Sequence, residues 1–137
     1  MKSVGIGFEN NSAILLKDYS KYVDFEINAH YTPLNAVKVL ADSHFNIAMR
    51  YHVMLIGARF GIPCIPICYC PKVSRLAEQL DLENLSLGVH DYDKLLEKIV
   101  YLEENFESIS KLMISKAEEM TKIAEKMFDD IYNILNK

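Results

Sequence analysis

The sequence lacks several features that define particular classes of protein. It contains no long hydrophobic run, since no apolar stretch approaches the roughly 20 residues that span a bilayer. The first residues, MKSVGIGFENN, carry one lysine, one acidic residue and little apolar length, so they do not resemble a signal peptide. No glycine- and serine-rich linker and no low-complexity stretch divides the chain. These absences favour a cytoplasmic globular protein without a transmembrane segment.

Basic residues are not in excess either. The chain has 15 lysine and arginine residues against 19 acidic ones, which gives a formal net charge of -4. This balance argues against a nucleic-acid surface, which needs clustered lysine and arginine. The apolar fraction of 50% and the charged fraction of 25% are ordinary for a globular domain. A chain of 137 residues can bury a real core without disulfides or a metal ion.

Cysteine is scarce and confined to one segment. The three cysteines are Cys64, Cys68 and Cys70, and an odd number so close together is a poor disulfide framework. On a strand all three would share one face, so a soft-metal site is conceivable. The second ligand pair of a zinc site is missing, however. We therefore predict buried strand thiols, with no metal and no cofactor.

Residues 1–90 alternate short apolar runs with helical stretches. The expected strands are Ser3–Phe8, Val23–Asn28, Phe45–Met49, Ile62–Tyr69 and Leu85–Val89. The expected helices begin at Pro33, Tyr51 and Pro71, with Thr32 as the N-cap of the first and Gly61 ending the second. Pro63 and Pro66 favour a strand end or an edge for the fourth strand. Strands that alternate with helices in this order predict an α/β fold with a Rossmann-like parallel sheet flanked by helices.

Residues 91–137 are almost unbroken helix formers. Their apolar residues recur at a 3-4 spacing, at Ile99, Leu102, Phe106, Ile109, Met113, Met120, Ile123, Met127 and Ile134. This spacing is also typical of a coiled coil. Because Lys116 and Asp130 interrupt the pattern, we favour a long helix, broken near Glu107–Ser110, that packs on the sheet or on another lobe. We expect one domain overall, with an α/β lobe at 1–90 and helices at 91–137.

Cationic side chains follow two of the predicted strands. Arg50 and His52 come directly after the strand at 45–49, and Lys72 follows the next strand. Ligands of parallel sheets bind beyond the carboxyl ends of strands, where helix starts offer free N–H groups. Arg50 adds a bidentate fork for phosphate or carboxylate, and His52 can exchange a proton near neutral pH. If the two strands are neighbours, the pattern predicts an anion pocket. The alternative is a hydrogen-bonded helix histidine beside solvated surface charges.

Residues 46–76 resemble the signature of the polysaccharide pyruvyltransferase family. In that family a strand leads into Arg-x-His, an apolar helix, Gly-x-Pro, a second strand and Tyr-Asp-x-Lys or a close variant. The matching residues here are Arg50, His52, Gly61, Pro63, Tyr69 and Lys72. Two positions depart from the pattern, because Cys70 stands where aspartate is usual and Tyr51 where leucine is common. The first departure removes a carboxylate that would orient Lys72.

The resemblance implies a fold, a donor and residue roles. Family enzymes resemble two-lobed glycosyltransferases of the GT-B type, and this chain would correspond to the carboxyl-terminal, donor-binding lobe. They place pyruvate from phosphoenolpyruvate on two hydroxyls of a polysaccharide or lipid-linked sugar acceptor as a cyclic ketal. Carried over from the family, His52 and Lys72 would hold phosphoenolpyruvate and Arg50 would bind its phosphate or carboxylate. His52 is further expected to act as the catalytic general acid or base.

Two alternative functions stay open. The first is a non-catalytic anion-binding or assembly module, whose helical tail docks on a missing amino-terminal lobe or on a second copy of the chain. Methionines at 113, 120 and 127 give that tail an adaptable apolar face. The second is the nucleotide-sugar lobe of a GT-B glycosyltransferase, since such lobes also bind phosphate at helix starts.

Overall fold

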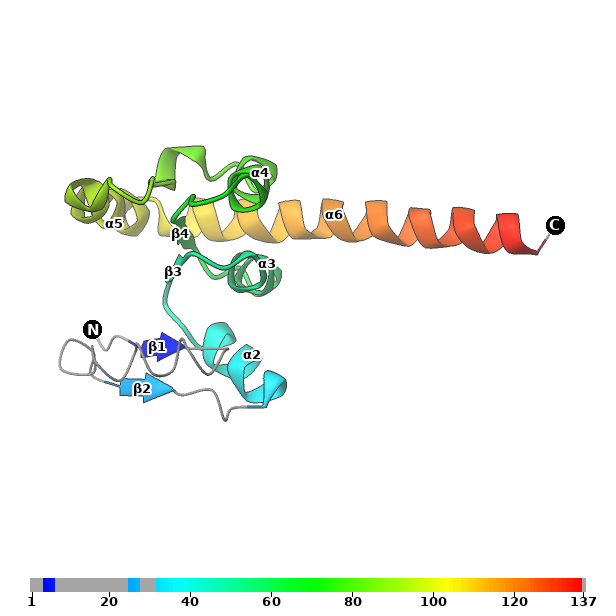
Figure 1. Cartoon of the computed structure of the whole chain (residues 1–137), viewed down its shortest axis with the longest axis horizontal. Helices are drawn as coiled ribbons and strands as arrows, with labels where there is room; N and C mark the ends of the chain where they lie inside the picture. The colour runs from blue at the N-terminus through cyan, green and yellow to red at the C-terminus, as the bar shows by residue number, and fades with distance from the viewer. Residues whose placement is uncertain (1–3, 7–24, 28–31, 137) are drawn as a thin grey trace. The chain divides into compact units, whose positions relative to one another are not determined.

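The computed structural model describes residues 4–6, 25–27 and 32–136 (Figure 1). The chain divides into two compact units, residues 1–39 and residues 40–137, which are described separately. The division of the chain at residue 90 that the sequence suggests stays a prediction.

In the first unit, strand β1 (Val4–Ile6) pairs in parallel with β2 (Phe25–Ile27). These pairs fall inside the two strands expected from the sequence, whose flanks lie outside the described residues. Helix α2 (Pro33–Ala41) follows and begins as predicted, with proline at its first position. The Thr32 hydroxyl accepts a hydrogen bond from the Asn35 N–H at 3.4 Å, which caps the helix.

The second unit opens with a strand–helix–strand segment. Strand β3 (Asn46–Ala48) leads through two residues into α3 (Tyr51–Arg59), and the chain returns as β4 (Cys64–Pro66), parallel to β3. Helix α4 (Pro71–Gln79) and the 3₁₀ helix η2 (Glu83–Leu85) follow. The two strands are therefore neighbours, which is the condition on which the expected anion pocket depends, and the helix predicted after each strand is confirmed.

The larger sheet that the sequence suggests is not confirmed among the described residues. The described residues form two separate two-stranded parallel sheets, β1–β2 and β3–β4, and each strand is three residues long. Most of the described chain is instead helical. The α/β order and the parallel pairing are present, but a Rossmann-like or GT-B lobe is not confirmed.

Pro66 explains why β4 has one regular neighbour. Ile67 donates its N–H to Ala48 O at 2.8 Å on the β3 side, whereas Leu87 donates to Pro66 O at 2.9 Å on the other side. Because a strand residue directs its N–H and C=O to the same side, the N–H that proline lacks would face Leu87. On that side the expected strand at 85–89 is reduced to a single parallel bridge between Ile67 and Leu87.

Two helices complete the second unit. They are α5 (Leu95–Glu104), preceded by the 3₁₀ helix η3 (Tyr92–Lys94), and α6 (Phe106–Leu135). The helix is interrupted at Asn105 and not at 107–110 as predicted. The Asn105 side chain donates to Tyr101 O at 2.8 Å, and the Asn105 carbonyl accepts from the Ser108 hydroxyl at 2.8 Å. Such local side-chain bonds compete with the helical ladder and favour an interruption.

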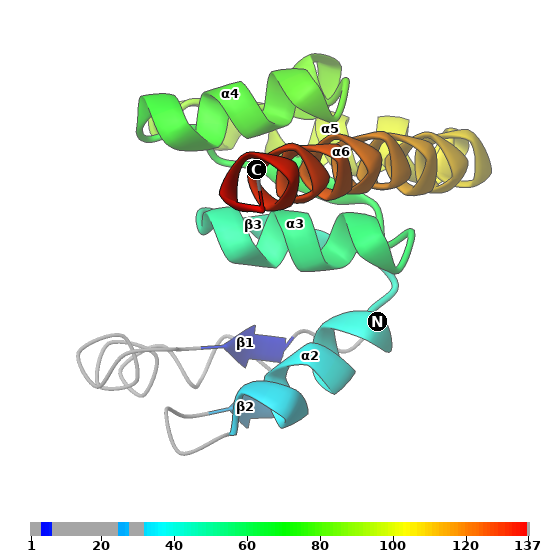
Figure 2. The same cartoon turned by 90° about the vertical axis from the view of Figure 1, so that its right-hand side faces the viewer.

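The core of this unit is shared by every helix from α3 to α6. Met54 and Ala58 of α3, Leu76 and Ala77 of α4, Leu102 of α5, and Ile109, Met113 and Ala117 of α6 are all buried in one cluster with the strands. Helix α6 crosses between α3 and α4 (Figures 1 and 2). The first half of the long helix packs on the strand–helix–strand segment, which is one of the two placements that the sequence left open. Residues 121–136 are exposed, and the helix extends beyond the core (Figure 1).

Glycine ends α3 as predicted and brings the chain close to α6. Gly61 adopts φ +67°, and the N–H groups of Gly61 and Ile62 bond back to Ala58 O and Gly57 O at 3.1 and 2.9 Å. The carbonyl of Gly61 accepts a hydrogen bond of 2.6 Å from the Ser110 hydroxyl of α6. This turn therefore returns the chain to β4 and fixes α6 at the same point.

His44 joins the segment before β3 to the helices. Its Nε2 lies 3.1 Å from both carboxylate oxygens of Glu103, and its ring stacks on Phe106 with centroids 4.5 Å apart. The histidine thus contacts both sides of the α5–α6 break. This placement gives His44 a structural role.

Candidate functional site

The predicted site residues lie at the starts of the two helices that follow β3 and β4. Arg50 is the N-cap of α3, with φ -102° and ψ 130°, and His52 is the second residue of that helix. Lys72 is the second residue of α4, after Pro71. All three side chains are exposed. Because β3 and β4 are parallel neighbours, both helix starts lie at the same edge of this strand pair.

One aromatic ring connects the two helix starts. The Nζ of Lys72 lies over the Tyr51 ring, 4.6 Å from its centroid. The His52 ring meets the same tyrosine edge-on, with centroids 5.6 Å apart and an interplanar angle of 84°. Lys72 and His52 are therefore held near one another through Tyr51, and Arg50 directly precedes that tyrosine in the chain. The sequence pattern does not reveal this bridge, although an aromatic residue between Arg50 and His52 was its available signal.

The environment of Cys70 differs from that expected of a strand thiol. Cys70 is the N-cap of α4 and is half-buried, so the prediction of a buried strand thiol is wrong for it. The backbone N–H groups at the start of α4, chiefly that of Val73, lower the pKa of the Cys70 thiol below its ordinary value. Partial burial opposes this effect, while the Tyr69 hydroxyl and the charge of Lys72 add to it.

Cys64 is the buried strand thiol of the prediction. It lies in β4 with no exposed surface, and burial raises its pKa to about 12. Cys68 lies between the strand and α4 and is half-buried, so the prediction of a buried strand thiol is wrong for it as well. Within the part of the chain that the structure describes, no three histidine, cysteine or acidic side chains gather as metal ligands would.

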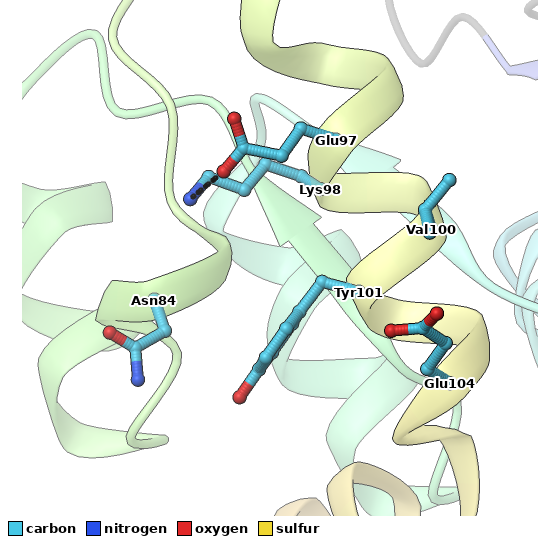
Figure 3. Close-up of a pocket in the computed structure, with 6 residues that line it drawn as sticks. All are labelled: Asn84, Glu97, Lys98, Val100, Tyr101 and Glu104. Atoms are coloured by element: carbon cyan, nitrogen blue, oxygen red, sulfur yellow. Dashed lines mark ion pairs between the residues drawn. The ribbon is translucent and has the colours of Figure 1, made fainter.

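A pocket among the described residues lies elsewhere in this unit. It has a volume of about 540 Å³ and is lined by Asn84 of η2 and by Glu97, Lys98, Val100, Tyr101 and Glu104 of α5 (Figure 3). The Lys98 Nζ is 3.7 Å from a Glu97 carboxylate oxygen. With two carboxylates against one paired lysine, this pocket is a poor place for an anionic donor.

No helix among residues 4–6, 25–27 and 32–136 combines the length and the apolar character that crossing a membrane requires.

Paired parallel strands, each followed by a helix start that carries cationic side chains, define an α/β protein with a candidate anion site. The polysaccharide pyruvyl transferase family model matches residues 3–71, which is half of the chain. The chain belongs to this family. The match contains Arg50 and His52 and ends one residue before Lys72. No curated protein and no solved structure matches the chain.

Proposed function

We propose that the chain binds phosphoenolpyruvate at the starts of α3 and α4 and serves pyruvyl transfer to a sugar of a polysaccharide. Family membership supports a pyruvyl transferase. The observation that carries the assignment of the site is the 4.6 Å contact between Lys72 Nζ and the Tyr51 ring. It brings the cation of α4 beside the start of α3, where Arg50 and His52 lie. Two helix starts with three cationic-capable side chains suit a phosphate and a carboxylate together.

The proposed chemistry divides between charge and proton transfer. Two sugar hydroxyl oxygens form bonds to the central carbon of the donor, its bond to the phosphate oxygen breaks, and inorganic phosphate leaves. Of the two hydroxyl protons released, one is balanced by the proton gained at the methylene carbon and the other by the phosphate. Arg50 and Lys72 would hold the anion and neutralise charge on the departing phosphate. His52 would deliver the proton to the methylene carbon.

The test is an amide NMR titration of the chain with phosphoenolpyruvate. Saturable shifts at 49–54 and 70–74, lost in Arg50→Ala, His52→Ala and Lys72→Ala, are the expected result. Arg75→Ala is the matched control, since it removes an exposed cation from the same helix as Lys72. Absence of shifts in the unmodified chain would contradict donor binding by this site. Displacement of phosphoenolpyruvate by a nucleotide sugar at lower concentration would favour the glycosyltransferase alternative.

A second candidate function, assembly, rests on the outer half of α6. Its apolar residues form a seam, here called the tail seam, whose side chains are 44–78% exposed. The tail seam consists of Ile123, Met127, Phe128, Ile131, Ile134 and Leu135. It continues the face that buries Met113 and Ala117 in the core. The partner proposed for it is a second copy of this chain.

The size and charge of the tail seam support that partner. It presents six large, exposed apolar residues along one face of a helix, the kind of contiguous patch that a protein partner covers. The polar face of the same segment carries Glu125, Asp129 and Asp130 against Lys122 and Lys126, and this balance does not favour an anionic membrane surface.

Sedimentation velocity over a wide concentration range tests the assembly role. Dimer formation that is lost in the double variant Met127→Glu, Ile131→Glu is expected. Asn133→Glu is the control, because it adds a carboxylate on the opposite face of α6. A chain that stays monomeric at every concentration would exclude the second copy as the partner of the tail seam.

A further inference from the structure

The residue between Arg50 and His52 has a position that its neighbours do not share. Tyr51 is the first residue of α3 and is half-buried, packed against the core cluster, whereas both neighbours are exposed. Its backbone is fixed by the helix start and its ring by the core. The Tyr51 ring is therefore a fixed surface, and contact with it can restrict the motion of exposed side chains nearby.

Two such side chains contact it. Lys72 carries its ammonium over the ring at 4.6 Å, within the range in which a cation is attracted to an aromatic face. His52 meets the same ring edge-on at 5.6 Å. An exposed lysine otherwise samples many rotamers, and restricting them costs conformational entropy. The tyrosine restricts Lys72 before any ligand arrives, and an ammonium with three N–H donors still has donors to offer an anion.

We infer that Tyr51 is a positioning residue of the donor site, which pre-orders Lys72 and His52 through the face and edge of its ring. This inference rests on the proposed function.

Substituting phenylalanine or leucine at position 51 distinguishes the effect of the aromatic ring from the effect of side-chain size. Tyr51→Phe keeps the aromatic face and is expected to bind phosphoenolpyruvate within about two-fold of the unmodified chain, whereas Tyr51→Leu is expected to weaken binding about two- to five-fold. The ε-methylene protons of Lys72 should show an upfield ring-current shift that is kept in the phenylalanine variant and lost in the leucine variant. If Tyr51→Leu does not fold, Tyr51→Met supplies an apolar side chain of adaptable shape without a ring.

A double-mutant cycle distinguishes positioning from general support of the fold. If Tyr51 acts through Lys72, then Tyr51→Leu has little further effect on binding in a Lys72→Met background. Equal losses in both backgrounds, or unchanged binding in Tyr51→Leu, would overturn the inference. Failure of the unmodified chain to bind phosphoenolpyruvate would instead overturn the proposed function, so the two failures are distinct.

Discussion

At the scale of single residues, two thiols six positions apart lie in opposite environments. Cys64 is enclosed in β4, where an ionised sulfur would lose its solvation, and its pKa rises to about 12. The N–H groups at the start of α4, chiefly that of Val73, stabilise the Cys70 thiolate and lower its pKa, although partial burial opposes them. The two residues are the same in chemistry, so their difference comes from the fold alone.

Thiol alkylation should report this difference directly. Cys70 is expected to react with iodoacetamide, with a pH–rate curve whose midpoint lies below the ordinary thiol pKa of 9.0. Cys64 is expected to stay unmodified in the native chain at the same pH values. Site-resolved mass spectrometry measures both rates, and Cys70→Ser identifies the fast phase. Modification of Cys64 ahead of Cys70 would contradict the assignment.

Gly61 is the residue at which a single methyl group should cost most. Its φ of +67° is unfavourable for any residue with a Cβ, and an added Cβ would lie 2.7 Å from Ile114 Cδ1. Gly61→Ala is expected to lower the free energy of unfolding by about 2 kcal/mol or more, measured by urea denaturation. The same Gly61→Ala substitution is then made in an Ile114→Ala chain, where the clash with Ile114 is absent and the backbone strain remains. No difference between the two backgrounds would show that the clash is relieved without cost.

At the scale of elements, the boundaries that were predictable are those with a local chemical signal. Thr32 before Pro33, Pro71 and Gly61 each mark a helix end through their own backbone properties, and the structure places each as expected. The break at Asn105 also has a local signal, but the apolar spacing obscured it. The contact of Tyr51 with Lys72 has only the aromatic residue itself as a signal, and that signal does not name the partner, because the contact depends on β3 and β4 being neighbours. The sequence of strands, helix starts and site residues could therefore be predicted, whereas the contact that joins the two helix starts could not.

The start of α4 lacks a good cap and can be improved. Cys70 makes no capping hydrogen bond through its side chain, whereas aspartate is among the best N-cap residues. Cys70→Asp is expected to raise the midpoint of urea denaturation by about 0.5 M, given typical capping energies and denaturant slopes. Cys70→Ala, which cannot cap, is the control. An aspartate variant no more stable than the alanine variant would mean that its carboxylate does not reach the N–H groups of α4.

The junction before α5 should weaken in acid. The Asp91 carboxylate accepts from Lys94 Nζ at 3.0 Å and from the Gly88 N–H at 2.8 Å, and these contacts lower its pKa. A carboxyl with a lowered native pKa stabilises the fold above its unfolded pKa, and this contribution is lost as pH falls through the native value. The free energy of unfolding, measured from neutral pH down to acid, should therefore fall more steeply in the unmodified chain than in Asp91→Asn. Parallel curves would exclude this carboxyl as a source of acid sensitivity.

At the scale of the whole molecule, stability should vary along α6 because only its first half shares the core. Ile109, Met113 and Ala117 are buried, whereas every residue from 121 to 136 is exposed. A helical segment of about 16 residues without packing is marginal in water, so its amides should open far more readily than those of the packed half. Hydrogen exchange at low protein concentration is expected to be slow at 109–117 and fast at 124–135. If a second copy covers the tail seam, protection of the outer half should rise with protein concentration in the unmodified chain and not in the Met127→Glu, Ile131→Glu variant. Uniform protection along α6 at every concentration would contradict both the gradient and the proposed association, since the outer half would then be stable without any partner.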